Sequence, residues 1–151
     1  MDKTAIEISN KLISCFEKGG KLLVCGNGGS SCESDHLVAE MVCTFETKRK
    51  PLPAISLTNS AILTAWSNDN NFSEVFSRQI EALGNPGDVL ICLTTSGKSK
   101  NIHSAIQKGM DKGMKVIVFP TRDKKTTAHC QEEHLVLIHK ICRLVDKYYE
   151  T

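Results

Sequence analysis

The sequence has little of what marks a membrane, secreted or nucleic-acid-binding protein. Its 151 residues contain no apolar run close to the roughly 20 residues that cross a bilayer. The first residues, MDKTAIEISNKL, lack the apolar core of a signal peptide. A formal net charge of +2 is too small for the dense basic face that binds nucleic acid. We therefore expect a cytoplasmic protein that binds neither membranes nor nucleic acid.

Cysteine is frequent, but its pattern lacks the signs of a disulfide framework. The seven cysteines include no C-x-x-C pair, and an odd number without paired spacing fits a reducing compartment. Cys25 and Cys92 lie inside apolar runs, where cysteine acts as a small hydrophobic residue. Like charges cluster at Lys48, Arg49 and Lys50, which we expect to lie in a solvated loop.

The length suggests one domain, spanning residues 1–151. Short apolar runs predict strands over 21–25, 53–57, 88–94 and 115–119. Helical periodicity and turn residues predict helices over 6–16, 30–44, 58–66, 72–83, 99–112 and 131–149. Strands that alternate with helices predict an α/β fold, a three-layer αβα sandwich around a parallel sheet of about four strands.

Helix caps can also be predicted from the residue types. Ser30 or Ser31 is expected to cap the second helix, with Glu33 in its first turn, where a carboxylate is favourable. Thr58 or Asn59 is expected to cap the third helix.

Two loops that follow predicted strands have the composition of an anion site. "CGNGGSS", residues 25–31, combines glycines with the start of a helix, and "TTSGKS", residues 94–99, offers four hydroxyls and Gly97. Neither is a Walker A loop or a G-x-G-x-x-G motif. Such turns can merely connect elements, but two of them at the carboxyl edge of one sheet favour phosphate binding.

His36 and Glu40 lie one turn apart on one face of the predicted second helix. Such a pair can share a metal ion or a proton path. The alternative is a hydrogen bond on a solvent-facing surface, which is the more common role of an isolated H-x-x-x-E.

The last helix offers Gln131 and His139, which are eight residues apart and therefore share a face. His139 lies at the margin of an apolar stripe, so the alternative to a functional role is a hydrogen-bonded histidine of the core. His129 and His134 have no such support and are expected at the surface.

The motifs taken together resemble those of the SIS sugar-isomerase family, and within it the phosphoheptose isomerases. The resemblance spans residues 4–150, with the motifs in the family's order: "CGNGGSS", "DHLVAE", "SNDNNFSEVFSRQIEALG", "LTTSGKS" and "QEEHLVLIH". It implies a flavodoxin-like SIS fold and the interconversion of sedoheptulose 7-phosphate and D-glycero-D-manno-heptose 7-phosphate through an enediol. It also implies a role in bacterial heptose, lipopolysaccharide or capsule synthesis, and a homo-oligomer, as a tetramer, with the site between subunits.

The resemblance also implies residue roles. Glu40 and His139 match the catalytic pair. Positions that match substrate contacts are Asn27, Gly28, Gly29, Ser30, Asp69, Thr94, Thr95, Ser96, Ser99 and Gln131. The set that holds zinc in some family members matches His36, Glu40, Gln131 and His139.

The chain departs from the family pattern at three places. Relatives commonly have Gly-Arg-Phe or Gly-Arg-Tyr where this chain has Cys43-Thr44-Phe45, so a polar contact near the sugar differs. Relatives carry further helical sequence before the part that matches Ala5 onward. Their segment between the fourth strand and the last helix is longer than 120–130 here, so we expect four strands rather than five.

Two other functions fit an SIS domain. One is a non-catalytic protein that binds a partner such as a replication initiator, and the other is a regulatory domain that senses sugar phosphates. Partner-binding relatives lack the catalytic Glu and His, whereas this chain has Glu40 and His139. The sequence therefore favours the enzyme.

Overall fold

A parallel sheet forms the centre of the computed structural model, which describes residues 2–121 and 126–151. Within these residues the sheet has four strands in the order β2-β1-β3-β4. They are β1 (Leu22–Gly26), β2 (Ala54–Ser56), β3 (Val89–Leu93) and β4 (Lys115–Val118). The predicted α/β fold with four parallel strands is therefore confirmed.

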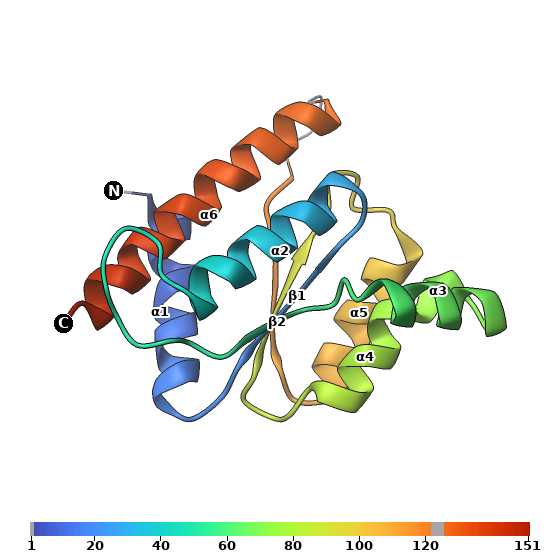
Figure 1. The fold of residues 1–151 in the computed structure, drawn as a ribbon. Coiled ribbons are helices and arrows are strands. Elements are labelled where there is room, and N and C mark those ends of the chain that lie inside the picture. The colour runs from blue at the N-terminus through green and yellow to red at the C-terminus, as the bar shows by residue number, and fades with distance from the viewer. Residues whose placement is uncertain (1, 122–125) are drawn as a thin grey trace.

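Helices cover both faces of the sheet (Figure 1). One face packs against α1 (Lys3–Glu17), α2 (Gly29–Val42) and α6 (Thr127–Tyr149). The other packs against α4 (Val75–Leu83) and α5 (Lys100–Asp111). Side chains alternate between the two faces, as a strand requires: Val24 and Ile91 lie in the first core, and Cys25 and Cys92 in the second. None of the helices in the described residues is long and apolar enough to span a membrane.

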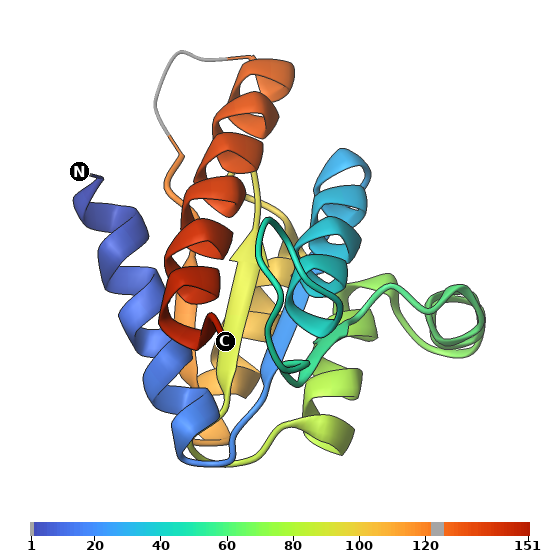
Figure 2. The ribbon, with the colours of Figure 1, turned by 60° about the vertical axis from the view of Figure 1, so that its left-hand side comes forward.

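The helix α3 (Ser60–Asp69) is the least packed element. It contains no buried residue, and Figures 1 and 2 show it standing out from the rest of the chain. A short 3₁₀ turn, η1 (Phe72–Glu74), connects it to α4. Asn59 caps α3 by accepting a hydrogen bond from the Ile62 backbone N–H, so this part of the cap prediction is confirmed.

The prediction for the start of α2 is wrong. The helix begins at Gly29, and the capping position is Gly28, whose φ of 57° is in the region that favours glycine. Ser30 therefore lies inside the first turn rather than at the cap, and Glu33 lies beyond that turn. The hydroxyl-rich sequence suggested a side-chain cap, but the glycine turn already brings the chain into the helix.

The helix α6 begins four residues earlier than the apolar pattern suggests. Thr126 caps it, with its hydroxyl accepting the backbone N–H of His129. The first turns are polar and exposed, so their hydrophobic periodicity is weak.

Arg49 is buried, so the prediction of a solvated loop at this residue is wrong. Its Nε donates to Oδ1 of Asp146 on α6 at 2.7 Å. The same guanidinium donates to backbone carbonyls at the end of α2 and in the following loop, those of Glu40, Met41, Cys43 and Lys50. The arginine therefore satisfies carbonyls that the end of a helix leaves unpaired.

The strand order sets the place where a ligand can bind. β1 and β3 are neighbours although they are not consecutive, because the chain continues from β1 to β2 on one side and later to β3 on the other. At such a switch point the two connections diverge and leave a crevice at the carboxyl ends of the strands. The loops after β1 and β3 are the two loops that the sequence marks for an anion.

Candidate active site

The two predicted anion loops meet around one cavity of about 240 Å³. The loop after β1 contributes Asn27, Gly28, Gly29 and Ser30 to its walls. The loop after β3 contributes Thr94, Thr95, Ser96 and Ser99, and α6 contributes Gln131. The structure thus brings together nine of the ten residues that match the family's substrate contacts.

Glycine allows the first loop to turn tightly. A Cβ on Gly26 would lie 2.8 Å from backbone atoms of Ser30, so the strand end and the helix start are in close contact. The backbone N–H of Ser30 donates to the Asn27 carbonyl, and that of Ser31 to Gly28. The loop is therefore held in one shape before any ligand binds.

The second loop is shaped by its own hydroxyls. Thr94 Oγ1 accepts the backbone N–H of Gly97 at 3.1 Å, and Ser96 Oγ accepts that of Lys98 at 3.1 Å. Gly97 has a φ of 67°, which favours glycine. Ser99 occupies the capping position of α5 without a side-chain capping bond, so its hydroxyl is not used to hold the helix.

A pair of amide hydrogen bonds joins the two halves of the cavity. Asn27 Nδ2 donates to Asn101 Oδ1 at 2.9 Å, and Asn101 Nδ2 donates back to Asn27 Oδ1 at 2.8 Å. Asn101 is buried in the first turn of α5, and sequence reasoning missed it because its partner lies 74 residues away. The N-termini of α2 and α5 meet at this point, and their positive dipole ends favour an anion.

The residues predicted for chemistry converge between α2 and α6, which lie side by side (Figures 1 and 2). Nε2 of His36 lies 3.1 Å from Nε2 of His139 and 3.9 Å from Oε1 of Glu40. The Phe45 ring stacks on His139, with centroids 5.0 Å apart, so one face of the imidazole is covered. Thr44, which stands at the position of the family arginine, is exposed.

Gln131 lies at the anion cavity, two helical turns from His139, or about 12 Å along the axis. It packs directly on Gly29, because a Cβ there would meet the Gln131 side chain at 2.5 Å. The absence of a side chain at Gly29 thus makes room for the glutamine.

Asp69 is the predicted substrate contact that lies apart from the others. It ends the projecting helix α3, where it accepts a hydrogen bond from the Asn68 side chain at 2.9 Å. The residues around the anion cavity do not include it.

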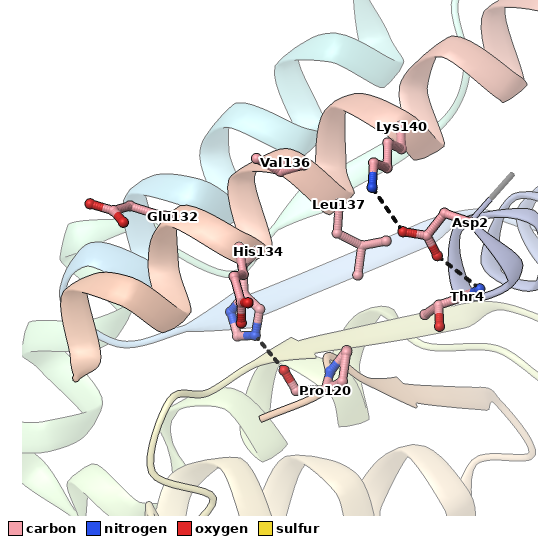
Figure 3. A pocket seen from close by; sticks show the side chains of 9 residues that line it. Asp2, Thr4, Pro120, Glu132, His134, Val136, Leu137 and Lys140 are labelled. Carbon is pink, nitrogen blue, oxygen red and sulfur yellow. Dashed lines mark hydrogen bonds and ion pairs between the residues drawn. The ribbon is translucent and has the colours of Figure 1, made fainter. Parts of the chain in front are cut away.

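A second cavity, of about 350 Å³, lies between α6 and the start of α1 (Figure 3). His134 lines it and is buried, so the prediction of a surface histidine is wrong. Its Nε2 lies 2.9 Å from the Pro120 carbonyl oxygen, and its ring meets Phe119 edge-on. The chain after β4 covers this face of α6, which the sequence pattern did not reveal. An ion pair between Asp2 and Lys140 lies at the other end of the cavity.

The family model described as "SIS domain" matches residues 3–120.

Curated relatives match over most of the chain. A protein of Thermoplasma volcanium named "Probable phosphoheptose isomerase" is 39% identical, covering 95% of this chain and 81% of its own. The phosphoheptose isomerase of Pelobacter propionicus is 42% identical, and the match covers 93% of this chain and 83% of the relative. The phosphoheptose isomerase of Synechocystis is 46% identical, and the match covers 87% of this chain and 76% of the relative.

Solved structures of two phosphoheptose isomerases have the same fold. The one from Francisella tularensis superposes with a TM-score of 0.89 at 36% identity, and the one from Neisseria gonorrhoeae with 0.87 at 35%. In both cases 95% of this chain and 85% of the other chain are covered.

Proposed function

Because the chain belongs to the SIS domain family, we propose that it is a phosphoheptose isomerase, which converts sedoheptulose 7-phosphate into D-glycero-D-manno-heptose 7-phosphate. The observation that carries this proposal is the juxtaposition of Glu40, His36 and His139 beside a cavity built for an anion. A phosphorylated ketose needs both parts, one to hold the phosphate and one to move a proton.

The phosphate binds in the cavity between the two loops. Hydroxyls of Ser30, Thr94 and Ser99 donate to its oxygens, and the N-termini of α2 and α5 add their positive dipole ends. The phosphate takes no part in the chemistry, so these contacts supply position. Holding the sugar in a reactive geometry is itself a large part of catalysis.

Isomerisation moves a hydrogen between the first two carbons of the sugar. Glu40 is the base that takes the proton from carbon, which leaves an enediol or enediolate. His139 exchanges protons with the sugar oxygens and with the neighbouring carbon, so the proton lost from the first carbon is replaced on the second and the aldose forms. The Phe45 ring holds the His139 imidazole in place. Proton transfer by such positioned groups contributes roughly 10²–10⁴-fold to a rate.

We propose that zinc binds at the His36–His139 pair, together with Glu40 and, in the bound state, Gln131. Two imidazole nitrogens bound to one tetrahedral zinc are about 3.3 Å apart, and the two Nε2 atoms here are 3.1 Å apart. In the described residues no three His, Cys, Asp or Glu side chains form a ready-made metal group, so Glu40 must shift to join them. A bound zinc ion supplies polarisation of the substrate carbonyl.

We also propose that the protein forms a homo-oligomer, a tetramer in which the active site lies between subunits. The projecting α3 supports it, because Ile62 on this helix and Phe72 next to it are exposed apolar side chains. Asp69 at the end of α3 then completes the substrate site of a neighbouring copy. The enzyme works in the cytoplasm, where it supplies heptose for the lipopolysaccharide or capsule of a bacterium.

The test is an isomerase assay with sedoheptulose 7-phosphate, with and without zinc, that follows formation of the aldose. Turnover by the unchanged protein, and its loss in both Glu40→Gln and His139→Ala, is the expected result. Absence of turnover together with tight binding of a protein partner would instead indicate the non-catalytic role.

A further inference from the structure

Glu33 has a carboxylate oxygen without a partner among the residues that the structure describes. Its Oε2 is buried and makes no hydrogen bond in the described structure. The other carboxylate near it on the same helix is different: Asp35 Oδ1 accepts hydrogen bonds from the hydroxyls of Ser56 and Thr58. The unpaired oxygen is therefore a local property of Glu33 rather than of α2.

Glu33 lies on the side of α2 that carries the proposed site. Residues 29, 33, 36 and 40 are spaced by four, three and four, which places them in one stripe along a helix. Two contacts show that this stripe faces α6: Gln131 packs on Gly29, and His139 contacts His36. Glu33 therefore lies in the seam between α2 and α6, between these two contacts.

The position along the helix is also informative. Glu33 is about 4.5 Å along the axis from Ser30 at the anion cavity and about 10 Å from Glu40. Along the axis of α2, Glu33 thus lies between the anion cavity, which it does not line, and Glu40, so a substrate that spans these two ends passes the level of Glu33. The carbons that lie between these two ends of a sugar phosphate carry hydroxyl groups.

A buried polar atom without a partner is costly, and native proteins rarely keep one without a reason. Burial also raises the pKa of Glu33 to about 7, so both protonation states of the carboxyl are available near neutral pH. A hydroxyl group can donate to a carboxylate and accept from a carboxylic acid. It is therefore a ligand that suits either state.

We propose that Glu33 binds a hydroxyl group of the sugar chain, between the phosphate and the reacting carbons. This inference rests on the proposed function and adds a residue that binds the polyol part of the substrate. Glu33 takes no part in proton transfer at the reacting carbons. Its contribution is to distinguish a phosphorylated polyol from other anions that fit the cavity.

The experiment compares the binding of two ligands by titration calorimetry, sedoheptulose 7-phosphate and inorganic phosphate. We expect Glu33→Leu to weaken binding of the sugar phosphate about 10- to 100-fold, as for one lost buried hydrogen bond. Its affinity for inorganic phosphate should stay within about twofold, because the anion cavity is unchanged. Glu33→Gln should retain most of the sugar affinity, since an amide both donates and accepts.

Thermal unfolding separates this role from a structural one. Because Glu33→Leu removes an unpaired buried oxygen, its melting temperature should equal or exceed that of the unchanged protein. Asp35→Asn is the matched control on the same helix and should bind both ligands normally.

Unchanged sugar affinity in Glu33→Leu would overturn the proposal, as would an equal loss of both ligands or a lower melting temperature. The proposed function fails separately, if the unchanged protein binds the sugar phosphate but does not isomerise it.

Discussion

The pair of Arg49 and Asp146 should determine how α2 and α6 sit against one another. The Arg49 side chain is 0% exposed and that of Asp146 2% exposed. Besides binding the guanidinium, Asp146 accepts the backbone N–H groups of Glu46 and Thr47 through Oδ2. Arg49 in turn binds the last carbonyls of α2, including that of Glu40 itself. The network thus joins the helix of the proposed base to the helix of His139.

Asp146→Asn keeps the shape of the side chain and removes its charge. It leaves the buried guanidinium without a counter-charge, and loss of one partner of such a pair costs about 3–5 kcal/mol. For a chain of this length, each kcal/mol lowers the melting temperature by about 2–4 °C. We therefore expect the melting temperature of Asp146→Asn to be about 6–20 °C lower than that of the unchanged protein.

The assay is thermal and urea unfolding, each followed by circular dichroism, with isomerase activity measured in parallel under native conditions. The matched control is Glu46→Gln, which removes the exposed ion pair with Arg143 and should cost less than about 1 kcal/mol. Folded Asp146→Asn should also turn over more slowly, because Glu40 and His139 are no longer held in register.

The reasoning is refuted if Asp146→Asn unfolds at the same urea concentration as the unchanged protein. It is also refuted if the effect of the substitution disappears in high salt, because a buried pair is little affected by screening.

Three further outcomes are expected. Gly26→Ala should lower phosphate affinity measured by calorimetry, because the new Cβ meets the Ser30 backbone at 2.8 Å. Gly19→Ala strains its own backbone, where φ is 79°, but lies outside the anion cavity and should leave phosphate affinity unchanged. A thiol reagent should label Cys32 and Cys43 rapidly and the five buried cysteines only on unfolding; fast labelling of more than two thiols would contradict the packing. Burial raises the pKa of Asp146, but its hydrogen bonds lower it overall. Its stabilisation is therefore present above about pH 4 and lost as pH falls through the folded-state pKa, so unfolding free energies of Asp146→Asn should depend less on pH in acid.

The sheet and its two loops could be predicted because their signals are local. A short apolar run marks each strand, and glycines and hydroxyls follow directly, so one window of sequence contains both. The convergence of His36 with His139 could be predicted only through the resemblance to a family, since 103 residues separate them.

Other features depended on partners that the sequence does not identify. Arg49 looks like one member of a basic run, and only the fold brings Asp146, 97 residues away, against it. His134 has polar neighbours in the sequence, but the chain after β4 buries it. The hydroxyls of Ser30 and Ser31 favour a helix start that puts Glu33 in the first turn, whereas Gly28, which has no side chain to signal a cap, begins the helix earlier.

Phosphate binding and proton transfer are proposed for different parts of the chain. The anion cavity is made mainly by the turns after two neighbouring strands, whereas the side chains proposed for proton transfer stand on two helices that cover the same face of the sheet. Substitutions along the helices can therefore change which sugar is accepted while the phosphate anchor stays intact. Such a division lets one scaffold diversify its substrates stepwise, with every intermediate still able to hold its ligand.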